Sequence, residues 1–180
     1  MQIRAVDTAD HTVTGVCVPY GEISFLTPNP LGEKVTPGAF TRSLSGREDK
    51  VFLYREHDHS RPVGRSMHFT DERAGLVGTF RIRPDDSGAQ VLADVADGWL
   101  PHMSVGFKEL RGRTDPDSGV HQVLEGHLME VSLLSLPAYD GARVLASRGA
   151  VLERTPVAGD SWINLPPQRF WSAWARRLDG

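Results

Sequence analysis

Cysteine is nearly absent from this chain of 180 residues, in which Cys17 is the single thiol. One thiol excludes an internal disulfide framework and any zinc cluster built from several cysteines. An excess of charge of one sign is also lacking, because 20 basic residues stand against 23 acidic ones. The sequence therefore predicts neither nucleic acid nor a membrane surface as a partner.

Long hydrophobic runs are missing as well. No segment approaches the roughly 20 apolar residues that a helix needs to cross a bilayer. The first residues, MQIRAVDTAD, carry no apolar stretch of the kind that makes a secretion signal. We expect a soluble protein of the cytoplasm, and its length suits one domain with its own core.

Short strands dominate the pattern that is present. Alternating apolar residues and turn signals predict strands in the segments HTVTGVCVPYG, KVFLYRE, PVGRSMHFTD, GLVGTFRI, SVGFKELRG and HLMEVSLLSL. The pattern predicts that PVGRSMHFTD and GLVGTFRI form a hairpin in which Gly75 takes a positive φ. Many strands and few helices predict a mainly β or α+β fold, a barrel or half-barrel with helices outside.

Three short helices are expected within the domain. In VTPGAFTRSL, Thr36 can be the N-cap and Pro37 the first helical residue. In DDSGAQVLADVADGWL, apolar residues at near-helical spacing follow Asp86 or Ser87 as the cap. The segment YDGARVLASR is the third.

The end of the chain differs in composition from the rest. We expect residues 1–150 to form the domain and residues 151–180 to be a linker followed by an amphipathic helix.

The segment LYREHDHSRPVG concentrates ionisable residues where a strand ends. If the strand continued through it, His57 and His59 would point the same way and could both reach one zinc ion. A third ligand at a recognisable spacing is missing, so we expect no metal. The alternatives are a catalytic base and a polar strand end with satisfied histidines.

A serine and a glutamate in later strands are the other candidates. Ser104 and Gly106 point to one side of a strand, while Val105 and Phe107 point to the other. Gly106 removes a side chain next to the serine and would let a substrate backbone approach. A serine in a strand is usually inert, so this position alone does not indicate a nucleophile.

Glu130 lies in a strand that is apolar on both faces. A carboxylate there is costly unless it is paired or hydrogen-bonded. It could face outward at a barrel edge, or it could be held against an imidazole. In the second case His57, Ser104 and Glu130 could form a unit in which the acid orients the imidazole and the imidazole takes the proton of the hydroxyl.

With these residues in view, the chain resembles a known family, the tailed-phage prohead (capsid maturation) serine proteases. That family is related to the herpesvirus assemblins. The matching blocks are GVCVPYGE, EKVTPGAF, LYREHDHSRPVG, AGLVGTFRI, HMSVGFKE and LMEVSLLSLPAYDGARV. The resemblance implies a herpesvirus-protease-like β-barrel flanked by a few helices. It also implies a serine endopeptidase with no cofactor.

The same resemblance implies roles for single residues. His57 would be the general base, Ser104 the nucleophile and Glu130 the third member. In relatives the histidine precedes the Pro-aliphatic-Gly block by five residues, which favours His57 over His59. The herpesvirus branch uses a second histidine as third member, so His127 remains an alternative to Glu130.

The resemblance also implies substrates and a setting. The enzyme would process scaffold and major capsid protein inside the immature prohead, in the cytoplasm of the bacterial host. It would act as a homodimer or as an oligomer that depends on assembly. The alternative is a non-catalytic capsid assembly or scaffold factor, and a third hypothesis is a zinc hydrolase that uses His57 and His59.

Overall fold

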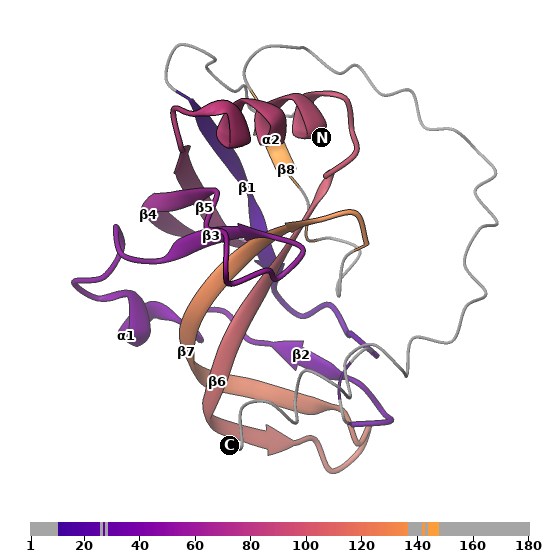
Figure 1. Ribbon diagram of the computed structural model, residues 1–180. Helices are drawn as coiled ribbons and strands as arrows, with labels where there is room; N and C mark the ends of the chain where they lie inside the picture. Colours follow the sequence, from indigo (N-terminus) through magenta and orange to yellow (C-terminus); the bar gives the residue numbers. More distant parts are fainter. Residues whose placement is uncertain (1–10, 26, 28, 137–141, 143, 148–180) are drawn as a thin grey trace, which may run out of the picture.

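The computed structural model describes residues 11–25, 27, 29–136, 142 and 144–147. Their elements follow in the order β1 Thr12–Pro19, β2 Glu33–Val35, α1 Thr41–Leu44, β3 Phe52–Arg55, β4 Gly64–Glu72, β5 Gly75–Ile82, α2 Asp86–Ala96, β6 His102–Thr114, β7 His121–Leu134 and β8 Val144–Ser147. The predicted mainly β fold with few helices is confirmed (Figure 1).

One sheet contains all eight strands. They follow the spatial order β2-β7-β3-β4-β5-β1-β8, and β6 pairs with β7 off this path. Strand β1 also approaches β6, so the sheet curls into a nearly closed barrel. The longest pairing, β6 with β7, is antiparallel and crosses the whole domain (Figure 1).

The predicted hairpin of β4 and β5 is confirmed. The two strands pair antiparallel, and Gly75 has a φ of 151°. A side chain at Gly75 would place its Cβ 2.3 Å from the carbonyl oxygen of Val18 in β1. Glycine is therefore required by both backbone conformation and close strand approach.

The first helix is shorter than the sequence predicts. It begins after Phe40, without a side-chain cap, and Thr36 instead donates its hydroxyl proton to the carbonyl oxygen of Val123. Gly38 has a φ of 77°, which a right-handed helix cannot include, so the predicted start at Pro37 was wrong.

The second helix begins one residue earlier than a cap at Asp86 predicts, and two earlier than a cap at Ser87. Its N-cap is Asp85, whose side chain accepts a hydrogen bond from the Gly88 N–H, and Asp86 is the first helical residue. Val91, Leu92 and Val95 are buried on the side of α2 that faces the barrel end. Figure 1 shows α2 lying across that end of the sheet.

The third predicted helix was wrong where the structure describes it. Val144–Ser147 is strand β8, which pairs antiparallel with β1. Pairing with an edge strand satisfies the backbone of this segment, and this tertiary contact overrides its helical pattern. The predicted linker and helix over residues 151–180 lie outside the described residues.

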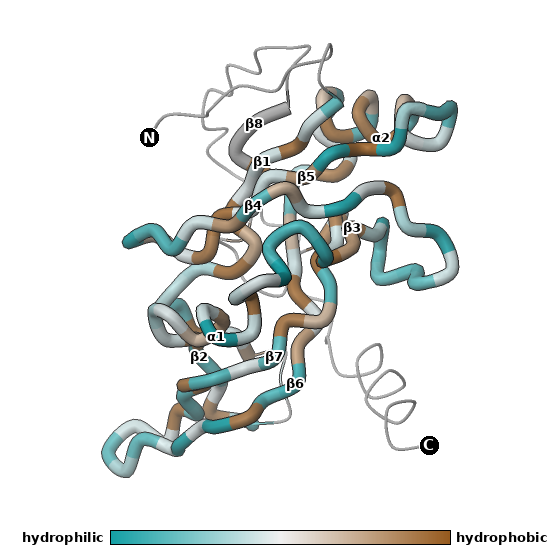
Figure 2. The backbone as a smooth tube through the Cα atoms, turned by 90° about the vertical axis from the view of Figure 1, so that its left-hand side faces the viewer, coloured by the Kyte–Doolittle hydropathy of each residue, from teal (hydrophilic) through white to brown (hydrophobic). Residues whose placement is uncertain are grey.

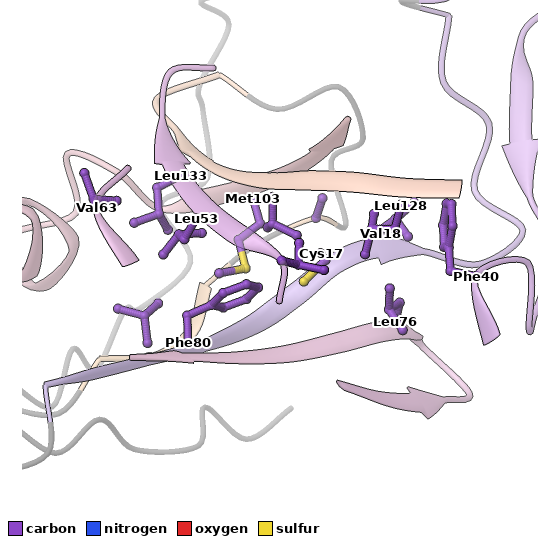
Figure 3. Packing of buried hydrophobic residues seen from close by; sticks show 14 of the residues in the cluster. Cys17, Val18, Phe40, Leu53, Val63, Leu76, Phe80, Met103, Leu128 and Leu133 are labelled. Carbon is purple, nitrogen blue, oxygen red and sulfur yellow. The ribbon is translucent and has the colours of Figure 1, made fainter. Parts of the chain in front are cut away.

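The core fills the inside of the barrel. Met103, Cys17 and Phe80 meet between the strands, with Leu53 and Leu133 close by (Figure 3). All five side chains are 0% exposed. Burial raises the pKa of the Cys17 thiol far above its ordinary value, which keeps that thiol protonated and unreactive.

Hydrophilic stretches gather at the ends of the hairpins. Figure 2 shows hydrophilic residues at the tips of the β4–β5 and β6–β7 hairpins. Neither helix in the described part of the chain has the length and apolar character needed to cross a membrane.

The cap of α2 can be tested by mutation. Asp85→Ala should lower the melting temperature by about 3 °C, because the Gly88 N–H loses its acceptor. Asp85→Asn should retain most of the stability, since an amide oxygen can also accept this bond. Asp86→Ala is the matched control and should have a smaller effect in calorimetry. Equal losses at the two positions would contradict the assignment of the cap.

Candidate active site

Strands β6, β7 and β3 lie side by side and bring three candidate positions into register. Ser104 in β6 is opposite Ser132 in β7, and Ser132 is in turn opposite Tyr54 in β3. The next row on the same face contains Gly106, Glu130 and Phe52. Residues opposite one another in neighbouring strands share a face of the sheet, so Ser104, Ser132 and Glu130 lie together.

This face is the outer one. The residues that alternate with it, Val131 and Leu133 in β7 and Leu53 in β3, belong to the core inside the barrel. The predicted alternation in β6 is confirmed, because Val105 and Phe107 pack against the core while Ser104 and Gly106 belong to the other face. The outer face is nevertheless covered here, since Ser104 is 4% and Glu130 3% exposed.

A β-bulge in β7 gives Glu130 its direction. Gly106 pairs with Glu130 and Phe107 pairs with Leu128, so Met129 is an extra residue without a partner in β6. Leu128 and Val131 are both fully buried in the core, whereas Met129 is 45% exposed. Without the bulge, strict alternation would put Glu130 on the same face as Leu128, in the apolar core.

Gly106 makes room for the carboxylate. A Cβ on this glycine would lie 2.6 Å from Oε1 and 2.9 Å from Cγ of Glu130. From the sequence we expected Gly106 to leave room for a substrate backbone. In the structure the space beside it is filled by the Glu130 side chain, so that expectation was wrong.

His57 belongs to the turn after β3, not to the strand. Glu56 and His57 have φ values of 51° and 56°, in the left-handed region that residues with side chains seldom adopt. The Glu56 N–H donates to the carbonyl oxygen of Leu133 and its carboxylate accepts from the Ser135 N–H, so β7 holds the turn at its start. This turn directs the imidazole toward Glu130.

Two hydrogen bonds hold the Glu130 carboxylate. His57 Nδ1 lies 2.8 Å from Oε1, and the Ser132 hydroxyl donates to Oε2 at 2.7 Å. His57 is 14% exposed, so this contact is well shielded from solvent. Of the two predicted surroundings of Glu130, the one against an imidazole is confirmed. The carboxylate lies on the outer face of the sheet, but it is buried there and not exposed at a barrel edge.

The negative charge of Glu130 reaches a neighbouring ring. Burial, and then the Glu130 carboxylate, raise the pKa of Tyr54 above its ordinary value. The Tyr54 ring also contacts that of His59, with centroids 4.9 Å apart. Tyr54 therefore stays neutral next to the buried pair.

Sequence reasoning missed Ser132. It is 0% exposed and lies two residues after Glu130, on the same face of β7. The period of two in a strand was the signal that could have found it, because a buried carboxylate needs a donor on its own face.

The alternative histidines lie elsewhere. His59 contacts Tyr54, and His127 faces α1, with Nδ1 3.5 Å from the Ser43 hydroxyl and Nε2 3.3 Å from Arg47. Glu130, and not His127, is the residue in contact with the His57 ring.

The alternative zinc site at His57 and His59 depended on both residues being in one strand. His57 and His59 are in a turn, where the i, i+2 rule for strands does not apply. In the part of the chain that the structure describes, the only three residues able to hold one metal ion together are Glu33, Glu109 and His121. That group includes neither residue of the pair.

A family model matches residues 1–154, and its description is caudovirus prohead serine protease. The chain belongs to this family. The resemblance inferred from the sequence blocks is thereby confirmed, and the match includes all three candidate positions of this prohead protease family member.

The prohead protease of Escherichia phage T5 is a relative with 23% identity over 137 residues. The match covers 75% of this chain and 64% of the T5 protein, so the chain spans slightly less than two thirds of that relative.

Solved structures with partial similarity come from phage and herpesviruses. The bacteriophage T4 capsid assembly protease has a TM-score of 0.49 at 15% identity, covering 68% of this chain and 80% of the other. The KSHV protease bound to a hexapeptide phosphonate inhibitor has a TM-score of 0.48 at 16% identity, covering 74% of this chain and 63% of the other.

The contact between Gly106 and Glu130 can be measured as a coupling. Gly106→Ala should lower the free energy of unfolding by about 1–3 kcal/mol, because the new methyl group overlaps the carboxylate. In a Glu130→Ala background the overlapping atoms are gone, and Gly106→Ala should then cost little. Urea denaturation of the four proteins gives the coupling. An equal cost in both backgrounds would show that Gly106 has another role.

Proposed function

We propose that this prohead protease family member is a serine endopeptidase in which Ser104 is the nucleophile, His57 the general base and Glu130 the residue that orients the base. The observation that carries the proposal is the 2.8 Å contact of His57 Nδ1 with Glu130, on the sheet face that also carries Ser104. Hydroxyl, imidazole and carboxylate are the groups that acyl transfer by a serine requires.

The hydrogen bond to Glu130 defines the tautomer of the histidine. With Nδ1–H donating to the carboxylate, Nε2 is the ring nitrogen that takes the proton of the Ser104 hydroxyl. The serine oxygen then bonds to the peptide carbonyl carbon, and the imidazolium returns its proton to the leaving amine. Water repeats these steps on the acyl-enzyme, which releases the acid and restores the serine.

Burial gives the carboxylate its effect. Glu130 is shielded from solvent, so its charge stabilises the imidazolium more strongly than a carboxylate in water would. Ser132 holds the second carboxylate oxygen and thereby keeps the first one on Nδ1. We assign Ser132 the role of a positioning residue.

The substrates follow from the family. The T5 relative is named a prohead protease and the T4 neighbour a capsid assembly protease. We propose that the chain processes scaffold and major capsid protein inside the immature prohead, within the bacterial host. We also propose that the chain is active as a homodimer or as an oligomer that forms during assembly. A requirement for this oligomer would keep the enzyme inactive until the shell has assembled.

A non-catalytic assembly factor is the second hypothesis. The contact between His57 and Glu130 is an arrangement that catalysis requires and an assembly factor does not. Among the described residues, no contact favours the assembly factor. Labelling with a fluorophosphonate separates the two hypotheses, since only an activated serine reacts.

Ser104→Ala should abolish processing of co-expressed capsid protein, with a loss of about 10⁴-fold or more in rate. Intact-mass analysis of the capsid protein measures this, and circular dichroism should show an unchanged fold. Unchanged processing by the Ser104→Ala variant would refute the assignment of the nucleophile.

Glu130→Gln should reduce activity by about 10⁴-fold, because the amide no longer stabilises the correct tautomer and the imidazolium. Ser132→Ala keeps the charge and should have a smaller effect. His59→Ala and treatment with a metal chelator are the controls, and both should leave the rate nearly unchanged. Loss of activity on chelation would favour the zinc hypothesis instead.

A further inference from the structure

A pocket of about 610 Å³ lies on the outer surface of the barrel, beside the candidate site. Its walls include Phe52 from β3, Arg65 and Met67 from β4, and Arg81 from β5. Phe52 is 47% and Met67 39% exposed, so apolar and cationic side chains are presented together.

The register of the sheet connects this pocket to the site. Glu130 is opposite Phe52, Phe52 is opposite Arg65, and Arg65 is opposite Arg81. Paired residues share a face, so a single row leads from the Glu130 carboxylate across the apolar Phe52 to two guanidinium groups. The strands that carry it, β7, β3, β4 and β5, are consecutive neighbours in the sheet (Figure 1).

The turn that carries His57 also borders the pocket. The chain leaves β3, places His57 on Glu130 and returns through Pro62, which lines the pocket wall, into β4. A peptide bound at the candidate site and extending past this turn would therefore contact Phe52 first, and then Arg65 and Arg81.

The two arginines are suited to bind an anion. Within the described residues, no ion pair joins Arg65 or Arg81 to an acid, and both are exposed. The third arginine of the lining, Arg83, is held by Asp85 at 2.7 Å, and Asp49 is the one acid in the lining. A guanidinium binds a carboxylate through two parallel hydrogen bonds.

A second arginine-containing pocket serves as a comparison. It is lined by Arg42, Arg47 and Arg111, but Arg42 and Arg111 both pair with Glu125. Arg47 donates to the carbonyl oxygens of Ser43 and Leu128. These guanidinium groups already have partners within the chain, so this pocket does not select an acidic ligand.

We propose that the pocket of Arg65 and Arg81 is a substrate subsite for an acidic side chain, with Phe52 contacting an apolar residue nearer the scissile bond. The inference rests on the proposed function, because it treats Ser104 as the point of cleavage. From β6 to β4 is three strand spacings, roughly 14 Å, which an extended peptide covers in about four residues. The acidic residue therefore lies about three to five residues from the scissile bond.

Cleavage-site profiling tests the subsite without a known substrate. The protein is incubated with a mixture of proteome-derived peptides, and mass spectrometry maps the new termini that Ser104→Ala does not produce. Wild-type protein should prefer Asp or Glu over Lys about tenfold at one position, three to five residues from the cut. The double variant Arg65→Glu/Arg81→Glu should reverse this preference.

The matched control is Arg73→Glu, an exposed arginine in the turn at the far end of the same hairpin. It reverses one arginine charge outside the pocket, half of the charge change in the double variant, and its profile should equal that of the wild type. The preference of the wild type should also weaken in about 0.5 M salt, because the arginines are exposed. A profile that is the same in the double variant would overturn the subsite while leaving the protease function intact.

A binding measurement separates failure of the subsite from failure of the protease function. Two fluorescent ten-residue peptides, identical except for Glu or Lys three residues after a Leu, are titrated against the Ser104→Ala protein. Tighter binding of the Glu peptide, lost in the Arg65→Glu/Arg81→Glu background, supports the subsite even if no cleavage is found. Equal binding of both peptides would overturn the subsite. So would a result in which sulfate displaces both peptides equally.

The occupant could also be a second copy of this chain. In that case sedimentation of the wild type would show a dimer that the double variant loses, and the Glu peptide would bind no better than the Lys peptide. That result would overturn the peptide subsite.

Discussion

The buried carboxylate of Glu130 is the constraint on which the rest of the site depends. Removing a charged group from water costs several kcal/mol unless partners replace the lost hydration. His57 replaces it on one oxygen and Ser132 on the other. Breaking such a buried pair by removal of one partner typically costs about 3–5 kcal/mol, so structure and chemistry at this position are linked.

The backbone departs from regular geometry at the two places that create this contact. An extra residue in β7 turns Glu130 to the outer face, and two consecutive left-handed residues, Glu56 and His57, bring the imidazole back over that face. Left-handed conformations of residues with side chains cost about 1–2 kcal/mol each. They persist here because β7 holds Glu56 through both its backbone and its side chain.

The division of the sheet into two faces explains how a small domain combines a stable core with a reactive surface. The inner face is apolar and closes on Met103, Leu53 and Phe80. The outer face keeps its polar groups in two adjacent rows that run across the strands. One row carries the serines of β6 and β7, and the next leads from Glu130 in β7 to the arginines of β4 and β5. A peptide that crosses from the serine row to the neighbouring row would meet the proposed nucleophile and then the arginines, which is the basis of the proposed subsite.

Local pattern by itself indicated strands β1, β3, β4, β5, β6 and β7, the β4–β5 hairpin, the need for glycine at position 75 and the three candidate residues. These features depend on side-chain periodicity and on backbone propensity over a few residues, which a sequence displays directly. The roles of the three residues came from resemblance to the family and stay a prediction, although the structure joins His57 to Glu130.

Only the tertiary structure decided the features that depend on distant partners. Strand β8 replaced a predicted helix because β1 offers it an edge, and the helix after Thr36 starts late because Thr36 bonds to Val123 in β7. The bulge at Met129, the room that Gly106 gives to Glu130 and the support from Ser132 likewise exist only once β6 and β7 have paired. Register between strands far apart in the chain is set by the packing of the whole sheet, and no local pattern contains it.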